Sequence, residues 1–419
     1  MAANIEPSLA DTDPDIADIV VREEARQNTV LEMIPSENYA SRAVIEAVGS
    51  VLTNKYAEGY PGARYYQGND IVDEAENLAR DRATALFGFD HANVQPHSGT
   101  QANMAVYLSV LKPGDTVMGL QLDAGGHLTH GHKVNASGKL YNFVSYGVDR
   151  ETETIDYDAM LELAKEYQPK LIVVGATAYP RQIDFARARK IADEIDAVLM
   201  ADIAHIAGLI AGGSHPSPLG HAQIVTSSTH KTLRGPRGGL VLSDSKYARR
   251  VDRGVFPGSQ GGPMMNVIAA KAVMLREAAT LQFQEYAYQT VENARVLAET
   301  LEDAGLRLVS GGTETHLVLV DVTPLDVVGN VAATALEAAG IVTNYNTIPF
   351  DPHPPTVGSG VRMGTPALTS RGMRAEEMRQ VGTLIARALE AHEDADVLAS
   401  VRSEVLMLSE AFPAPGLPR

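Results

Sequence analysis

One lysine of the chain lies where a covalent bond to an aldehyde could form. Lys231 follows a β-rich segment that ends in small hydroxyl residues, and Gly235, Gly238 and Gly239 come after it. An α/β sheet presents its ligands at such strand ends. Desolvation there would lower the pKa of the amine and let it form an imine with an aldehyde cofactor. A solvated loop lysine would give the same pattern, so spacing alone leaves both interpretations open.

A carboxylate supports the first interpretation. Asp202 ends the apolar run 197–201, where a charge is costly unless it is paired. Its partner could be a protonated pyridine nitrogen, which would keep a cofactor ring cationic and able to accept electrons. The alternative is a helix cap or an ion pair at a strand end. His205 could bracket the same ring or bond a backbone carbonyl, and the sequence favours neither role.

A candidate anion site lies earlier in the chain. Ser98, Gly99 and Thr100 precede an apolar helical pattern that runs to Leu111. The backbone N–H groups of a helix start would face an anion such as a phosphate. The same three residue types also cap helices for purely structural reasons, so the motif needs support from other residues.

The elements that must position these residues alternate along the chain. Helical patterns separate short apolar runs, and this alternation predicts an α/β fold with a mainly parallel central sheet sandwiched by helices. The candidate strands are Thr116–Leu120, Leu171–Gly175, Val198–Ala201, Ile224–Thr226 and Leu240–Leu242, with helices such as Thr100–Leu111 and Phe185–Ile195 between them.

Four parts are predicted in order. An N-terminal helical arm, 1–45, begins its helix at Asp13-Pro14, a common pair of cap and first-turn residues. The large domain, 46–285, carries the candidate strands. A long helical pattern from Val267 to about Glu302 leads into a smaller C-terminal α/β domain, 286–411, with a strand at 316–322 and a helix at 375–391. The proline-rich end, 412–419, is predicted to be a flexible tail.

The composition restricts the partners. The chain has 419 residues, of which 45% are hydrophobic and 21% charged, and a net charge of −17. This charge argues against nucleic acid or an anionic membrane surface, and any phosphate site must be locally basic. The absence of cysteine excludes disulfides and thiolate metal sites, and no metal site is expected. Without a signal-like start or a long apolar span, the expected location is cytoplasmic.

The lysine lies within a longer pattern, Thr229 to Gly239, that resembles the pyridoxal 5'-phosphate (PLP) lysine signature of the serine hydroxymethyltransferase family. The similarity runs in the same order over roughly residues 15–395. It implies the PLP-dependent transferase fold of type I. The other matching stretches are 54–62, 64–66, 95–99, 125–131 and 256–258.

The resemblance implies a role for each matching residue. Lys231 would hold PLP covalently, Asp202 would pair with its pyridine nitrogen, and His127 would stack on its ring. Glu58 would move the proton of the hydroxymethyl group, with Tyr66 and His205 also in the catalytic set. The implied cofactor contacts further include Ser98, Gly99, Thr100, Thr177, His205, His230, Tyr56 and Gly262; the substrate contacts are Ser36, Tyr56, Glu58, Tyr66 and Arg362; the folate contacts are Leu122, Gly126, Leu128 and Asn346.

The implied reaction interconverts serine and glycine with tetrahydrofolate as the one-carbon carrier. Tyr56, Glu58, Tyr66 and Gly262 would come from a neighbouring chain, which implies a homodimer with shared sites, or a tetramer of two such dimers. Departures from the family pattern near the pockets, such as Thr177 for serine, bear on substrate choice. One methyl group changes discrimination by only ~1–3 kcal/mol. Two alternatives are therefore an α-methylserine hydroxymethyltransferase that uses D- or L-alanine, and a folate-independent aldolase or transaldolase.

Overall fold

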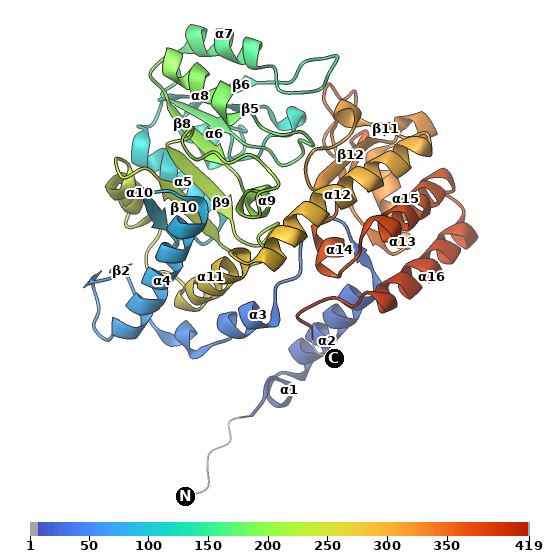
Figure 1. The fold of residues 1–419 in the computed structure, drawn as a ribbon, viewed down its shortest axis with the longest axis horizontal. Helices are drawn as coiled ribbons and strands as arrows, with labels where there is room; N and C mark the ends of the chain where they lie inside the picture. Colours follow the sequence, from blue (N-terminus) through green and yellow to red (C-terminus); the bar gives the residue numbers. More distant parts are fainter. Residues whose placement is uncertain (1–6, 418–419) are drawn as a thin grey trace, which may run out of the picture.

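The computed structural model describes residues 7–417, which pack around two main hydrophobic centres (Figure 1). The outermost residues of the predicted arm and tail, 1–6 and 418–419, lie outside this range. One centre draws its residues from Val44 to Ala287, and the other combines Leu31 and Met33 with residues between Ala294 and Leu408. Helix α12 (Leu281–Asp303) belongs to both, because it runs from the first half of the molecule into the second.

The larger half is built on a seven-stranded sheet. Strands β5 to β9 run parallel to one another, whereas β10 is antiparallel to its neighbours β4 and β9, which confirms the predicted mainly parallel sheet. In spatial order the strands are β4 (His91–Asn93), β10 (Gly239–Ser243), β9 (Ile224–Ser228), β8 (Val198–Asp202), β7 (Leu171–Val174), β5 (Thr116–Leu120) and β6 (Asn142–Tyr146).

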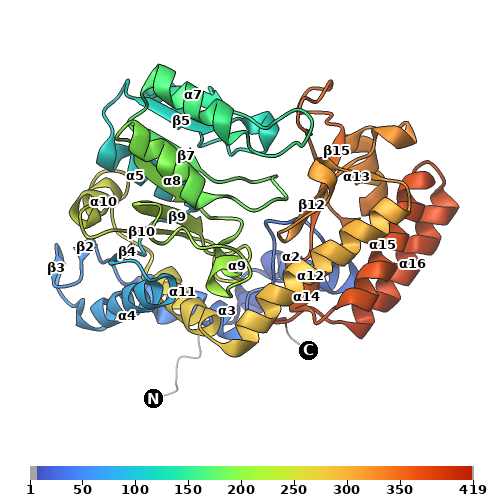
Figure 2. The same cartoon turned by 45° about the horizontal axis from the view of Figure 1, so that its top comes forward.

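Helices cover both faces of this sheet because buried strand residues alternate between two apolar clusters. Val117 and Met200 pack with α5 and α10 on one face. Met118 and Leu199 pack with α4, α7, α8 and α11 on the other. Figure 2 shows this layering. The bounds are α4 (Asp70–Phe87), α5 (Gly99–Val110), α6 (Ala136–Leu140), α7 (Tyr157–Tyr167), α8 (Phe185–Glu194), α9 (Ala207–Ala211), α10 (Ala248–Val255) and α11 (Met265–Ala278), with a 3-10 turn at Leu122–Ala124.

One predicted helix is two. The helical pattern from Val267 to Glu302 is interrupted between α11 and α12. Thr280 caps the second helix, because its side chain accepts a hydrogen bond of 3.2 Å from the Phe283 N–H. The apolar periodicity continues across this break and hides it in the sequence.

The smaller half contains a four-stranded antiparallel sheet, and its strand β12 agrees with the predicted run 316–322. Figure 1 shows α15 and α16 on its outer side. The strands, in spatial order, are β11 (Arg307–Leu308), β12 (Leu317–Asp321), β15 (Gly360–Gly364) and β14 (Asn344–Asn346); the helices are α13 (Gly329–Ala338), α14 (Pro366–Ser370), α15 (Ala375–Glu390) and α16 (Ala395–Ala411), and short 3-10 turns lie at Val309–Gly311 and Thr323–Leu325.

The N-terminal segment packs onto the smaller half. After α1 (Leu9–Thr12) and α2 (Pro14–Thr29), strand β1 (Leu31–Glu32) pairs in parallel with β13 (Ile341–Val342). As predicted, Asp13 caps α2 by accepting a hydrogen bond from the Ile16 N–H. The chain then crosses to the larger half through α3 (Arg42–Val48), a 3-10 turn (Val51–Asn54) and the hairpin β2 (Gly59–Tyr60) and β3 (Ala63–Arg64).

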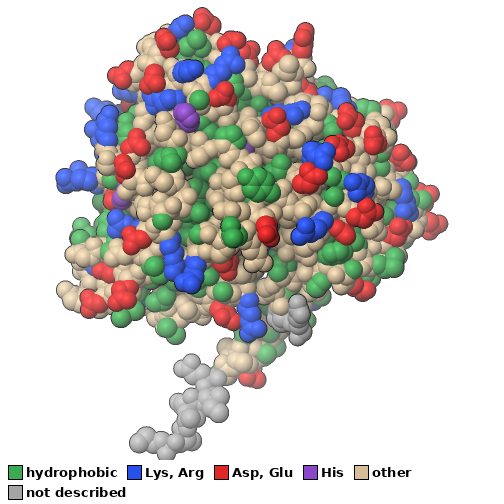
Figure 3. Space-filling model, in the orientation of Figure 1, with side chains coloured by type: hydrophobic (Ala, Val, Ile, Leu, Met, Phe, Trp, Pro, Cys, Tyr) green, Lys and Arg blue, Asp and Glu red, His purple; other side chains and the backbone are tan. Residues whose placement is uncertain are grey.

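The surface and the C-terminal segment complete the picture. On the face in Figure 3, acidic side chains are widely spread and basic ones lie among them. Within residues 7–417, every helix is too short or too polar to span a lipid bilayer. In the segment predicted to be a tail, Ala414 is buried in a small cluster with Tyr39 and Ala367.

Candidate active site

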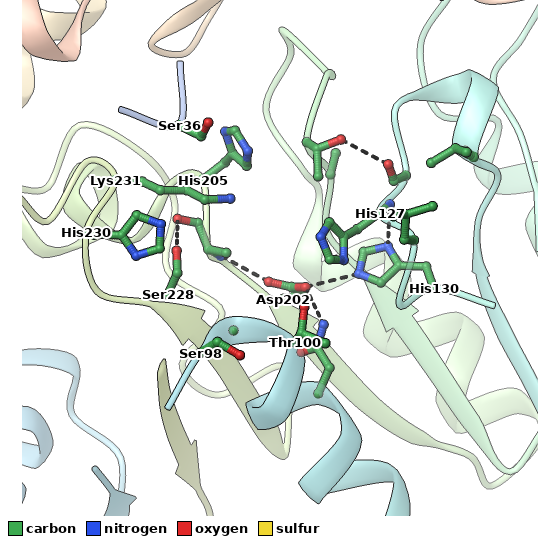
Figure 4. A pocket seen from close by; sticks show the side chains of 18 of the residues that line it. Ser36, Ser98, Thr100, His127, His130, Asp202, His205, Ser228, His230 and Lys231 are labelled. Carbon is green, nitrogen blue, oxygen red and sulfur yellow. Dashed lines mark hydrogen bonds and ion pairs between the residues drawn. The ribbon is translucent and has the colours of Figure 1, made fainter. Parts of the chain in front are cut away.

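The carboxyl edge of the parallel strands opens into one cavity of about 430 Å³. Figure 4 shows the Lys231 side chain above and to the left of Asp202, with Ser98 and Thr100 below them. Many of the sequence-predicted residues meet here. Those that line the cavity are Ser36, Ser98, Gly99, Thr100, Leu122, Gly126, His127, Leu128, Thr177, Asp202, His205, His230, Lys231 and Arg362.

Asp202 is a buried carboxylate with three hydrogen-bond donors. Asn103 Nδ2 and His130 Nε2 donate to Oδ2 at 2.8 and 3.0 Å, and the Ala204 N–H donates to Oδ1 at 3.1 Å. Burial alone would raise the pKa of Asp202, but the hydrogen bonds that its carboxylate accepts from His130 and Asn103 hold this pKa well below its ordinary value. Asp202 is therefore ionised and available to a cationic partner in the cavity.

Two histidines beside Asp202 are held in defined tautomers. The backbone N–H of His127 donates to His130 Nδ1, so His130 Nε2, which faces Asp202, carries a proton. The Thr129 N–H donates to His127 Nδ1 at 3.2 Å. Burial lowers the pKa of His127 to about 4, against the opposing charge of Asp202. The His127 ring is thus neutral near pH 7 and suited to stacking on an aromatic ring.

Lys231 has a fixed backbone and an amine with a lowered pKa. Its carbonyl accepts a hydrogen bond of 3.0 Å from Asn38 Nδ2, and Asn38 also bonds the Tyr286 hydroxyl at 2.8 Å. The Tyr286 hydroxyl donates to the Thr232 carbonyl. Burial lowers the pKa of Lys231 to about 8, while the charge of Asp202 opposes the shift. A useful fraction of neutral, nucleophilic amine is therefore present near pH 7.

The floor of the cavity is a helix start. Ser98 caps α5 by accepting a hydrogen bond from the Gln101 N–H, so the N–H groups of the first turn point toward the cavity end. Ser228, His230 and Arg237 also line this end. The buried Nδ1 of His230 has no hydrogen-bond partner within residues 7–417. This donor set fits a phosphate group, as the sequence predicts for residues 98–100.

Arg362 reaches the cavity from strand β15 of the smaller half. Its Nε donates to Asn344 Oδ1 at 3.0 Å, and Nη1 donates to the Thr177 carbonyl at 2.6 Å. The remaining N–H groups of the guanidinium are left for a ligand carboxylate. Burial lowers the pKa of Arg362 to about 10, so the group stays cationic near pH 7. The Thr177 hydroxyl is itself engaged, because it donates to the Gly126 carbonyl at 2.9 Å.

His205 forms part of the cavity wall and packs against a second histidine, His316. Its Nδ1 lies 3.3 Å from His316 Nε2, with the two rings tilted by 30°. Burial, with the nearby charges of Lys231 and Arg362, holds the pKa of His205 well below its ordinary value. Both rings are accordingly neutral, and His205 presents an uncharged ring to the cavity.

A second cluster of predicted residues lies outside the cavity. The rings of Tyr56 and Tyr66 meet edge to face at 5.1 Å. A Cβ atom on Gly262 would lie 3.0 Å from the Tyr56 ring, and one on Gly261 would lie 3.3 Å from Glu58 Oε1. Tyr56, Glu58, Tyr66 and Gly262 thus gather on one surface of the chain. Asn346, on β14, is also outside the cavity, where its Nδ2 bonds the neighbouring Thr347 carbonyl.

A buried arginine fixes the backbone around Glu58. Arg64 Nη1 donates to the carbonyls of Ala57 and Gly59 at 2.8 and 2.9 Å. Its other nitrogens bond the carboxylates of Asp73 and Glu76 at 2.8 and 2.6 Å. The backbone carbonyls on both sides of Glu58 are therefore held in place by a buried, ion-paired side chain.

Several functional residues were missed by the sequence reasoning. Asn103 and His130 bond Asp202, Asn38 holds the Lys231 backbone, and Asn344 orients Arg362. One of them left a signal: Asn103 is an amide inside an otherwise apolar helical pattern, and a buried amide needs partners.

The donor set as a whole fits PLP. The amine of Lys231 suits an aldehyde, the ionised Asp202 suits a pyridinium nitrogen, and the start of α5 suits a phosphate. The unpaired Nδ1 of His230 gives a further partner for an anion. Within the described range, no group of three His, Asp or Glu side chains could hold a metal ion.

Comparisons with known proteins agree with this geometry. The family model of serine hydroxymethyltransferase matches residues 9–385. Serine hydroxymethyltransferase of Koribacter versatilis (strain Ellin345) is 56% identical over 413 residues, covering 99% of this chain and 97% of its own. That of Acidobacterium capsulatum is 56% identical over 416 residues with the same coverages. That of Myxococcus xanthus (strain DK1622) is 58% identical over 406 residues and 97% of each chain. A match of this extent shows that the chain belongs to the serine hydroxymethyltransferase family.

Proposed function

We propose that the chain transfers a hydroxymethyl group between serine and tetrahydrofolate, with glycine as the other amino acid and PLP as the cofactor. The observation that carries this proposal is that Lys231, Asp202 and Arg362 line one cavity. An amine, a carboxylate and a guanidinium placed together suit an aldehyde, a pyridinium nitrogen and an amino-acid carboxylate. Family membership, which rests on a match over 99% of the chain, supports the assignment.

PLP, when bound, accepts the electron pair that is released as the Cα–Cβ bond of serine breaks. The chain's own residues prepare this step. Asp202 offers its charge to the ring nitrogen, and its bonds to Asn103 and His130 keep that charge in place. His127 offers a neutral ring for stacking. The N-terminus of α5, with Ser98, Gly99 and Thr100, holds the phosphate end, assisted by His230.

Arg362 is the substrate clamp in this proposal. Because Asn344 and the Thr177 carbonyl each accept one of its N–H groups, the guanidinium plane is fixed before the amino acid arrives. A planar fork can then bond both oxygens of the α-carboxylate. Ser36 lines the same cavity and is placed to assist.

We infer that the proton on the serine hydroxyl is moved by a second chain. Tyr56, Glu58, Tyr66 and Gly262 cluster away from their own cavity, so they are free to cover the cavity of a neighbour. Apolar side chains close to Tyr56 and Tyr66 in the sequence are well exposed, including Val51 at 80% and Ile71 at 69%. Exposed apolar surface of this kind marks an interface. A homodimer with shared sites, alone or paired into a tetramer, accounts for both observations.

The proposal also covers the folate contacts, the domain division and the cellular location. Leu122, Gly126 and Leu128 line the cavity and offer an apolar wall to a pterin ring, and Asn346 would approach from the smaller half. We place the division between the two domains within α12, a few residues after the predicted position 285, because Ala287 packs in the larger core and Ala294 in the smaller. We also propose a cytoplasmic location, since neither a phosphorylated cofactor nor a polyanionic folate crosses a membrane unaided.

An assay of the PLP-loaded chain tests the function. With serine and tetrahydrofolate, glycine should form, and its formation should stop when folate is omitted. Lys231→Ala should abolish turnover and the visible absorbance of the bound cofactor, whereas Lys246→Ala, a change at an exposed lysine, should preserve both. In the reverse direction, glycine should be a better acceptor than L- or D-alanine. Turnover without folate, or a preference for alanine, would overturn the assignment.

A further inference from the structure

Lys271 is a lysine that is almost fully enclosed by the protein. It lies on α11, its side chain is 2% exposed, and its Nζ donates to three backbone carbonyls. The distances are 2.6 Å to Val94, 2.9 Å to Pro96 and 2.8 Å to Gly239. Burial lowers the pKa of this amine to about 7, but three carbonyl acceptors favour its ammonium form, which has three N–H donors. All of them are used here, and no carboxylate within residues 7–417 bonds this amine.

The three carbonyls belong to the two segments that carry the cofactor site. Val94 and Pro96 lie between β4 and the Ser98–Gly99 start of α5. Gly239 begins β10, directly after the loop that carries Lys231. The Gly239 N–H also donates to the Pro96 carbonyl at 2.9 Å. Lys271 therefore bonds to the phosphate end and to the lysine end of the site at the same time.

The segment 94–97 needs such a partner because it is not part of a strand. A buried carbonyl without a hydrogen bond is costly, so each of these groups requires a donor. Gln260 supplies two of the remaining bonds: its Nε2 donates to the Gln95 carbonyl and its Oε1 accepts from the His97 N–H, both at 3.0 Å. Two side chains thus replace the missing strand neighbour.

Close packing leaves the Lys271 side chain little room to move. A Cβ atom on Gly238 would lie 2.5 Å from Lys271 Cε and 3.0 Å from Thr229 Oγ1. A Cβ atom on Gly239 would lie 2.3 Å from the Ser98 carbonyl oxygen. Only glycine at both positions lets the lysine stem, the Lys231 loop and the start of α5 approach one another this closely.

We propose that Lys271 is a positioning residue of the cofactor site, which sets the distance between the phosphate-binding start of α5 and the loop that carries Lys231. This inference rests on the proposed PLP function. Lys271 touches neither cofactor nor substrate; it acts through the backbone of residues 94–97 and 239. Replacing Lys271 should therefore weaken cofactor binding by more than the accompanying loss of folding stability can explain.

The test compares two changes on the same helix. Lys271→Met keeps an unbranched apolar side chain as far as Cε and removes all three donors, while Leu275→Ala creates a cavity at a buried core position outside the site. After the cofactor is stripped, PLP is titrated back and its visible absorbance gives the dissociation constant. We expect Lys271→Met to raise this constant about tenfold or more, the effect of losing hydrogen bonds from a charged group, and Leu275→Ala to leave it near the wild-type value while lowering the melting temperature.

A chemical rescue separates the charge from packing. Because the chain contains no cysteine, Lys271→Cys can be alkylated at one position in denaturant and refolded. Bromoethylamine restores an ammonium and should recover cofactor affinity; iodoacetamide adds a neutral group and should not. If Lys271→Met does not fold, Lys271→Arg provides the test instead. The planar guanidinium cannot direct three hydrogen bonds to these carbonyls, so this variant should also bind PLP more weakly.

The outcomes are distinct. A wild-type chain that shows no absorbance with PLP would refute the proposed function itself. A wild-type chain that binds PLP, together with a Lys271→Met or Lys271→Arg variant that binds it equally well, would refute the role of Lys271 alone.

Discussion

The side-chain amide of Asn103 donates a hydrogen bond of 2.8 Å to the Asp202 carboxylate, and both residues are buried. The same nitrogen donates to Thr129 Oγ1 at 2.8 Å, and Thr129 lies 2.7 Å from His127 Nδ1. Asn103 Oδ1 accepts from Thr226 Oγ1 at 2.6 Å. One amide on α5 therefore joins the carboxylate that should meet the cofactor nitrogen to the histidine that should stack on its ring.

Replacement of this amide should damage the site and the fold together. Asn103→Leu leaves Asp202, Thr129 and Thr226 each short of one partner, which should lower the free energy of unfolding by about 1–3 kcal/mol. Cofactor affinity should fall about tenfold, because the carboxylate and His127 lose their alignment. Urea denaturation and PLP titration measure the two effects.

Asn293→Leu is the matched control for this change. Asn293 is an equally buried amide in the smaller half, and it donates to Thr369 Oγ1 and to the Met373 carbonyl at 2.9 Å. It should cost a similar amount of stability without altering the PLP dissociation constant. If both variants weaken PLP binding equally, Asn103 has no special role at the site.

Lys231 should destabilise the cofactor-free protein. Its folded pKa is lowered to about 8 from 10.5, so the unfolded chain binds more protons between these values, and stability rises with pH across this window. At pH 7 the buried charge should cost about 3 kcal/mol. Lys231→Met should therefore raise the free energy of unfolding of the cofactor-free chain at pH 7.

The advantage of Lys231→Met should shrink as the pH approaches 10, where the native amine is already neutral. Urea denaturation of the cofactor-free chain at several pH values measures it. Lys246→Met, at an exposed lysine, should change stability little at any pH. A Lys231→Met variant that is no more stable than Lys246→Met at pH 7 would show that the buried amine carries no such penalty.

Asn344 should affect substrate binding through Arg362. Its Oδ1 accepts the Nε–H of Arg362 at 3.0 Å, and the two residues are register partners on β14 and β15. Asn344→Ala should free the guanidinium to rotate, so that bidentate bonding to the α-carboxylate of serine becomes weaker. We expect the KM for serine to rise about tenfold with a smaller change in kcat.

Steady-state kinetics with serine varied at saturating folate make this measurement. Tyr345→Ala, a change at an exposed neighbour on the same strand, is the control and should leave the KM near the wild-type value. A fall in kcat at unchanged KM would place Asn344 in the chemical step instead.

The sequence predicted those parts of the fold that depend on local pattern. Strands such as β5 and β8 are short apolar runs, and their bounds agree closely with the prediction. The break at Thr280 was missed because the helical periodicity continues through it. The position of the N-terminal segment could not be predicted either. Two residues of β1 pair with β13, which lies more than three hundred positions later, and such a pairing leaves no local signal.

The same distinction between local pattern and long-range contact applies to the site. Asp202 could be singled out because it is a charged residue at the end of an apolar run, whereas Lys231 was singled out by the family pattern around it, which also implied both roles. Their supports could not, because Asn103 and Asp202 are 99 positions apart and meet only when α5 packs under the sheet. The resemblance implied that the residues around Glu58 act from a neighbouring chain, but their position outside the cavity of their own chain could be seen only in three dimensions.

The separation of these clusters predicts complementation between two inactive chains. Lys231→Ala should disable the cavity of its own chain, and Glu58→Gln should disable the cavity that its chain covers. In a mixed dimer, one cavity then carries both defects and the other carries none. After random exchange of subunits, half of the dimers are mixed, so about a quarter of the wild-type activity should return.

The control pairs two changes from the same cluster. Asp202 and Lys231 line the same cavity, so every cavity in a mixture of Lys231→Ala and Asp202→Asn chains lacks one of them, and no activity should return. Differently tagged chains would verify that subunits exchange in both mixtures. If exchange occurs and the Glu58→Gln mixture stays inactive, each chain must complete its own site, and Glu58 must then reach its own cavity by a rearrangement of the 55–66 segment. Because Arg64 anchors the carbonyls on both sides of Glu58 in the buried interior, such a rearrangement would have to break two hydrogen bonds of a buried ion-paired side chain, whereas docking of a second chain breaks none.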